Sequence, residues 1–300
     1  MEGLFLLSLG LFMKVVLADS MLAGSADTIF GSQGKLGALD AWTGVLAFSG
    51  QIFFDFAGYS TCAIGAALCL GFILPLNFRF PYAAIGFTDF WRRWHITLSA
   101  WLRDYLYIPL GGNRKGRLRT YMNLMITMLL GGLWHGANWT FVAWGGLHGL
   151  YLWGERLFTD RKDSRLSREG NPIPAMAEPV KAGIGLPASN RWAYALLTFL
   201  LINITWVFFR SPTFTGAGNV LQSMFGMVHE ATPLLTTIAI IKVAVIVAAM
   251  LVAHWLMRNT TILDLIRRLP WWVTGLSWSL MLILLILSQE SSSSFIYFQF

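Results

Sequence analysis

Residues 122–153 read MNLMITMLLGGLWHGANWTFVAWGGLHGLYLW and contain no Asp, Glu, Lys or Arg. An apolar stretch of this length predicts helices inside a bilayer, where only helices or closed barrels satisfy every backbone polar group. Two candidate spans, 121–134 and 137–155, meet at His135-Gly136. The stretch therefore predicts a broken or re-entrant pair of helices that turns beside an ionisable imidazole.

The composition of the whole chain fits the same class of protein. The chain has 300 residues, of which 56% are hydrophobic and 12% are charged. Soluble domains carry about 25% charged residues. The basic residues behind the net charge of +7 lie in loops between apolar runs, as the positive-inside rule expects. This placement argues against a nucleic-acid partner. We expect an all-α, polytopic bundle in a lipid bilayer.

The apolar runs set the predicted order of spans. A second pair of short runs is interrupted by Asp55 and Gly58, and we expect re-entrant helices around a funnel or tunnel there as well. Basic clusters in 79–120, 156–192 and 258–269 predict three cytoplasmic loops within a single membrane domain, 1–300. The candidate spans are 3–22, 41–57, 60–76, 121–134, 137–155, 193–209, 236–257 and 270–288.

An aromatic stripe marks the segment 89–105. Its members recur at helical spacing, which predicts one amphipathic helix capped by Thr88 or Asp89 and ended by Pro109. One interpretation is an anchor at the membrane surface, and the other is a helix that dips into the funnel. His95 falls on the stripe side. The stripe consists of Trp91, Trp94, Leu98, Trp101 and Tyr105.

His135 allows a functional and a structural interpretation. It could be a reactive base, or a packed histidine bonded to a backbone carbonyl. Ionisable groups inside membranes are rare, which favours function. Asn138 would share a face with His135 in a continuous helix, where it could fix the imidazole tautomer, hold a substrate oxygen or join two helices. His148 would point nearly opposite in an unbroken helix, and we assign it to packing.

The chemistry open to such a site is limited. We find no metal-ligand spacing and no serine-nucleophile motif. A neutral imidazole in a water-poor setting can take a proton from an alcohol that attacks a carbonyl. The sequence therefore favours general-base catalysis by His135, without a bound metal.

Two blocks then resemble a known family. DFWRRWHITLSAWLRDYLYIPLGG, residues 89–112, and GLWHGA, residues 132–137, are similar to the membrane-bound O-acyltransferases. The likeness is nearest to the branch that acetylates alginate and D-alanylates teichoic acids. Residues 58–82 and the terminal 295–300 also match the alginate branch. Members usually carry further spans before the segment that 10–14 resembles, so we expect an N-terminally short chain.

The resemblance implies acyl transfer across the bacterial inner membrane by a multi-pass enzyme. An acyl thioester, either acetyl-coenzyme A or an acyl carrier, would be a co-substrate, with no bound cofactor. The acceptor would be a hydroxyl of an exported polysaccharide, with periplasmic partner proteins. The catalytic histidines map to His135 and His95. The positions expected to bind substrate or donor are Asn138, Arg92, Arg93, Arg103 and Asp104.

Two alternatives remain at this stage. A transporter or flippase could use His135 as a proton relay, but it would need internal repeats and more acidic residues at the midplane, where only Asp55 is a candidate. A catalytically inactive scaffold subunit is favoured if the N-terminus is truly short.

Overall fold

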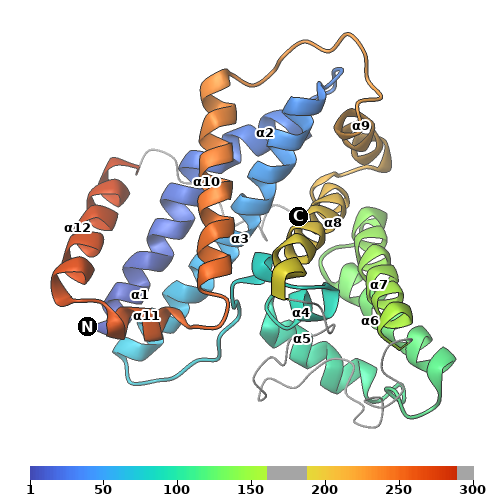
Figure 1. Ribbon diagram of the computed structural model, residues 1–300, viewed down its shortest axis with the longest axis horizontal. Helices are drawn as coiled ribbons and strands as arrows, with labels where there is room; N and C mark the ends of the chain where they lie inside the picture. Colours follow the sequence, from blue (N-terminus) through green and yellow to red (C-terminus); the bar gives the residue numbers. More distant parts are fainter. Residues whose placement is uncertain (161–187, 289–300) are drawn as a thin grey trace. The chain divides into compact units, whose positions relative to one another are not determined.

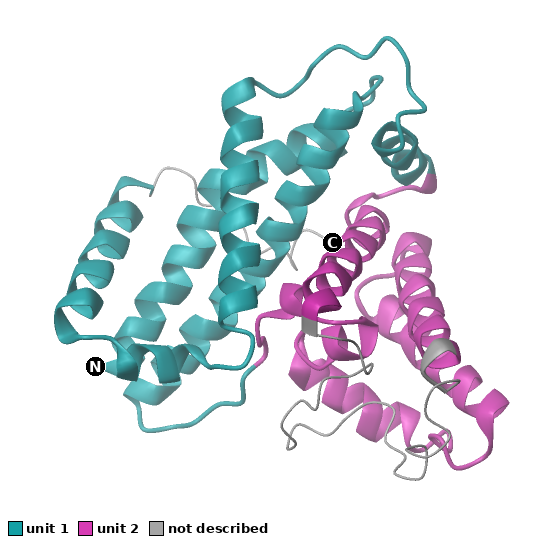
Figure 2. Ribbon diagram, in the orientation of Figure 1, with its two compact units in different colours: residues 1–76, 215–300 teal, residues 77–214 magenta. Residues whose placement is uncertain are grey.

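The computed structural model describes residues 1–160 and 188–288, and within them the regular elements are all helical (Figure 1). The chain divides into two compact units (Figure 2). Unit 1 contains residues 1–76 and 215–300, and unit 2 contains 77–214. The expected single domain over 1–300 stays a prediction.

Unit 1 is built on long apolar helices. α3 packs against α1, η1, α2 and α10, and α1 also contacts α12 (Figure 1). A π-helical segment, η1, joins α1 to α2. The elements are α1 (Glu2–Leu11), η1 (Phe12–Ala23), α2 (Gly24–Phe30), α3 (Ala38–Cys69), α9 (Phe214–Met224, with its first residue in unit 2), α10 (Thr237–Leu256), α11 (Ile262–Arg268) and α12 (Trp271–Leu287).

Helix α3 runs without a break through Asp55 and Gly58, so the predicted interruption of 41–76 is wrong. Asp55 forms an ion pair with Lys14, which also bonds Asp19 at 2.8 Å. Gly58 serves packing, because a Cβ there would lie 2.7 Å from the carbonyl oxygen of Gly10. Small residues allow such close approach of membrane helices.

Unit 2 begins with short helical pieces and continues with three longer helices. Helices α6 and α7 pack side by side, and α7 also contacts α8. The elements are η2 (Pro81–Ala83), α4 (Phe87–Trp91), α5 (Ile96–Leu102), η3 (Arg103–Tyr107), α6 (Arg117–Trp134), α7 (Trp139–Asp160), η4 (Ala188–Asn190) and α8 (Arg191–Arg210).

The α6–α7 hairpin turns where the sequence predicted. Helix α6 ends at Trp134 and α7 begins at Trp139. The two backbones meet closely, because a Cβ on Gly132 would collide with the carbonyl oxygen of Phe141 and one on Gly145 with that of Met128. The predicted break at His135-Gly136 is confirmed.

The predicted single helix over 89–105 is wrong. The segment forms three short helices, with a turn at 92–95 between α4 and α5. His95 begins α5 in the left-handed region, at φ 42°. The aromatic stripe is divided accordingly: Trp94 is 2% exposed, whereas Trp101 is 52% exposed.

Four described helices are long and apolar enough to cross a membrane, namely Glu2–Phe30, Ala38–Cys69, Arg191–Arg210 and Thr237–Leu256. The expected all-α membrane fold is confirmed. The predicted loop 156–192 needs new bounds, because α7 continues to Asp160 and α8 begins at Arg191. Its remaining part, 161–187, lies outside the described residues.

Candidate active site

His135 stands at the end of α6 inside a cage of aromatic rings. Its ring centroid is 5.0 Å from that of Trp134, 5.1 Å from Trp144 and 5.1 Å from Phe209. These rings come from α6, α7 and α8, so three helices build the cage. Aromatic walls supply little solvation for a cation, and the neutral imidazole is therefore favoured there.

His95 approaches the same place from the turn between α4 and α5. Its ring centroid lies 6.1 Å from that of Trp134, so this indole borders both histidines. His95 is 8% exposed, and burial lowers the pKa of its imidazole to about 4. The ring is therefore neutral at physiological pH. Its positive φ is uncommon for a residue with a Cβ, and such strained positions concentrate at functional sites.

His148 belongs to the same cluster, which the sequence reasoning did not expect. Its ring lies 4.8 Å from that of Trp144, which also borders His135. Its Nε2 is 3.1 Å from Oγ1 of Thr205 on α8, and the residue is fully buried. The opposite-face expectation assumed an unbroken helix, and the turn at 135–138 removes that assumption.

Asn138 holds the backbone around the α6–α7 turn. Its Oδ1 accepts a hydrogen bond from the backbone N–H of Thr140 at 3.1 Å, and its Nδ2 donates to the carbonyl oxygen of Pro212 at 2.9 Å. The shared helical face with His135 does not form, because the helix is interrupted between them. Asn138 thus ties the start of α7 to the segment after α8.

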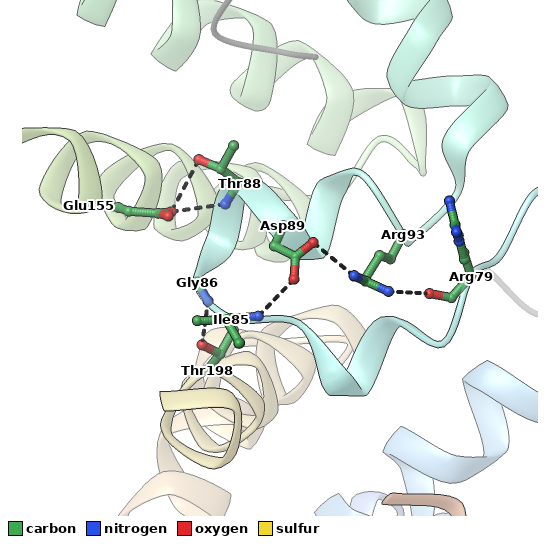
Figure 3. Close-up of polar contacts among 8 residues, drawn as sticks. All are labelled: Arg79, Ile85, Gly86, Thr88, Asp89, Arg93, Glu155 and Thr198. Carbon is green, nitrogen blue, oxygen red and sulfur yellow. Dashed lines mark hydrogen bonds and ion pairs between the residues drawn. The ribbon is translucent and has the colours of Figure 1, made fainter. Parts of the chain in front are cut away.

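Arg93 and Asp89 form a buried pair that organises the segment around α4 (Figure 3). Nε of Arg93 donates to Oδ1 of Asp89 at 2.8 Å, and Nη1 donates to the carbonyl oxygen of Arg79 at 3.2 Å. Oδ2 of Asp89 accepts from the backbone N–H of Ile85 at 2.9 Å. The Arg93 side chain is 1% exposed, so its guanidinium is committed to the fold.

Arg92, the neighbouring residue, is placed differently. It is partly exposed, and its Nε donates no hydrogen bond within the described part of the chain. Burial lowers the pKa of this guanidinium, while the charges of Asp89 and Glu155 act in the opposite direction. Of the two adjacent arginines, Arg92 has the more exposed side chain.

Arg103 and Asp104 pair with each other on η3. Nε of Arg103 donates to Oδ1 of Asp104 at 2.7 Å, and Nη2 donates to Oδ2 at 2.9 Å. The guanidinium lowers the pKa of the Asp104 carboxyl. The Asp104 side chain is 45% exposed, so this pair lies at the surface of unit 2.

Glu155 is the residue that the sequence analysis missed. Its Oε2 accepts a hydrogen bond from the backbone N–H of Phe87 at 2.9 Å. It also accepts one from the backbone N–H of Thr88 at 2.8 Å (Figure 3). The carboxylate on α7 therefore caps α4, in place of the expected local cap by Thr88 or Asp89. The sequence does set Glu155 apart, because it is the first acidic residue after Asp104 and ends a long stretch without carboxylates.

The site thus contains the imidazoles of His135 and His95 beside one indole, with Arg92 in the same turn as His95 and Glu155 on α7. A sequence model of the membrane-bound O-acyltransferase family matches residues 11–164, which include this whole set. The chain belongs to the membrane-bound O-acyltransferase family. The matched region covers η1, α3, the broken segment around α4 and the α6–α7 hairpin.

Known relatives support the same assignment. The chain is 45% identical to the peptidoglycan O-acetyltransferase of Helicobacter pylori over 75% of this chain and 39% of that protein. It is 45% identical to the probable alginate O-acetylase of Pseudomonas aeruginosa over 75% of this chain and 38% of that protein. The teichoic acid D-alanyltransferase of Streptococcus thermophilus is 32% identical over 67% and 48%. The chain therefore spans about two fifths to one half of these relatives' lengths.

Proposed function

We propose that this protein is a membrane O-acyltransferase that transfers acetyl groups to hydroxyls of an exported bacterial polysaccharide. The observation that carries the proposal is the pair of imidazoles beside Trp134, buried His95 and partly exposed His135. Trp134 is 54% exposed, so the indole that borders both imidazoles is accessible. The names of the relatives support the acyl group and the class of acceptor.

In this mechanism His135 is the general base. The neutral imidazole takes the proton of the acceptor hydroxyl while the oxygen attacks the thioester carbonyl. The new C–O bond forms, the C–S bond breaks, and the proton leaves with the thiolate as a thiol. General-base catalysis contributes roughly 10²- to 10⁴-fold. His95, held neutral by burial, orients the donor or the acceptor.

The donor side of the site is formed by Arg92. The residue is partly exposed, and its guanidinium suits the phosphate groups of acetyl-coenzyme A or of an acyl carrier, which act as co-substrates rather than bound cofactors. Arg93 supports the fold through Asp89, and Asn138 holds the turn beside His135. Arg103 and Asp104 form an exposed pair that could contact a donor at the surface of unit 2.

The location and the partners follow from the acceptor. An exported glycan lies outside the cytoplasm, so we propose a multi-pass protein of the bacterial inner membrane, with periplasmic partner proteins that complete the transfer. The proton-relay alternative is less well supported, because Asp55, the acid that it would need, forms an ion pair with Lys14.

The test is the variant His135→Ala, expressed with all neighbouring genes of its operon. Acetyl content of the exported polymer is measured by NMR, together with the amount of inserted protein. We expect acetylation to fall by 10²- to 10⁴-fold. His229→Ala is the matched control, since His229 is exposed in unit 1 and should leave acetylation unchanged. Normal acetylation by stable, inserted His135→Ala would disprove the assignment.

A further inference from the structure

We propose that Glu155 is a positioning residue, whose carboxylate holds α4 against α7 and thereby sets the place of His95 relative to His135. The inference rests on the proposed acyl transfer. Glu155 binds the backbone N–H groups of Phe87 and Thr88, so its effect on the reaction passes through the backbone of 86–95.

The contact is a cap supplied by a distant part of the chain. Oε2 of Glu155 accepts from the backbone N–H of Phe87 at 2.9 Å, the backbone N–H of Thr88 at 2.8 Å and Oγ1 of Thr88 at 3.2 Å. The first N–H groups of a helix have no partner within it, and a carboxylate satisfies them well. Charge-assisted bonds of this kind are stronger than bonds between neutral groups.

Gly86 makes room for this carboxylate. Its φ is +87°, and a Cβ there would lie 2.5 Å from Oε1 of Glu155. Its own N–H donates to Oγ1 of Thr198 on α8 at 3.0 Å. The residues just before α4 are therefore tied to both α7 and α8, as Figure 3 shows.

A short series of hydrogen bonds leads from the cap to Trp94, the residue before His95. The N–H groups of Arg93 and Trp94 donate to the carbonyl oxygen of Phe90 at 2.9 Å and 2.8 Å, and Asp89 holds Arg93. His95 is the next residue along the chain. On the other side, α7 carries Trp144, which borders His135. One carboxylate thus joins the element that carries the first histidine to the element that borders the second.

The experiment compares Glu155→Ala with Glu155→Gln in the complete operon background. Glutamine keeps a side-chain oxygen that can accept the hydrogen bonds from Phe87 and Thr88. Alanine has no acceptor, so these hydrogen bonds are lost. We expect Glu155→Ala to reduce polymer acetylation at least about tenfold per inserted protein, because a misplacement of about 1 Å can cost about 100-fold. Glu155→Gln should keep at least half of the wild-type value. Glu2→Gln is the control, since Glu2 pairs with exposed Arg267 in unit 1 and should have no effect.

The outcomes separate this inference from the proposed function. Normal acetylation by Glu155→Ala, or an equal loss in the Ala and Gln variants, overturns the positioning role while His135→Ala still tests the chemistry.

If Glu155→Ala does not accumulate in the membrane, Thr88→Val carries the test, because it removes only the Oγ1 contact. A severalfold loss at unchanged protein amount then supports positioning, and unchanged acetylation overturns it. Normal acetylation by His135→Ala would instead reject the proposed function.

Discussion

Helix α3 of unit 1 and the segment around α4 in unit 2 both bury acidic side chains, but in different ways. In α3, Asp55 is 1% exposed and pairs with the side chain of Lys14, and the helix continues through it. Around α4, Asp89 accepts a backbone N–H as well as Arg93, and Glu155 accepts two backbone N–H groups. The second arrangement is seen at a break between helices, and in α3 it is seen at the first turn, where buried Asp40 accepts the backbone N–H groups of Leu234 and Leu235.

The difference has a simple physical cause. Inside a continuous helix every N–H already bonds the carbonyl four residues before it, so a buried carboxylate there must find a side-chain partner. Free N–H groups occur at helix starts and in the loops between helices. A segment that uses carboxylates to bind backbone N–H groups therefore contains helix starts or loops, and there the chain can change direction. In unit 2 this change of direction places His95 beside Trp134.

The largest expected contrast comes from removing one acid in each region. Asp89→Ala leaves Arg93 buried without its carboxylate, which should cost about 3–5 kcal/mol of unfolding free energy. Asp55→Ala should cost less, because Lys14 keeps Asp19 and is partly exposed. Denaturant unfolding of both variants in detergent micelles measures the difference. Equal losses of unfolding free energy in the two variants would mean that the two ion pairs contribute equally to stability.

A smaller effect is expected where helices touch through glycine. Gly145→Ala places a Cβ against the carbonyl oxygen of Met128 and should cost about 1–3 kcal/mol by overpacking. Gly154→Ala is the control on the same helix, since no described atom lies within 4 Å of its Cβ. That change should stabilise the protein by about 0.4–1 kcal/mol. Thermal unfolding of both variants checks this, and a tolerated Gly145→Ala would show that α6 and α7 can separate.

The smallest effect concerns pH. The pKa of His95 is about 4 in the folded protein, below its ordinary value of 6.5. Between these two values the unfolded chain binds more protons, so stability falls as the pH falls. We expect a loss of roughly 1–2 kcal/mol between pH 7 and pH 5. His95→Asn, which tolerates a positive φ, should flatten this slope in denaturant unfolding at each pH. An unchanged slope would assign the pH dependence to other groups.

The sequence by itself determined the membrane class, the helical content, the turn at 135–136 and the two histidine motifs that reveal the family. These features depend on local properties, namely hydrophobic length, glycine and residue identity. The tertiary structure alone decided that α3 is continuous, that 89–105 is broken, and that His148 joins the aromatic cage. It also supplied the cap from Glu155. Asp55 pairs with Lys14 and Glu155 caps the start of α4, and both contacts join residues that lie far apart in the sequence.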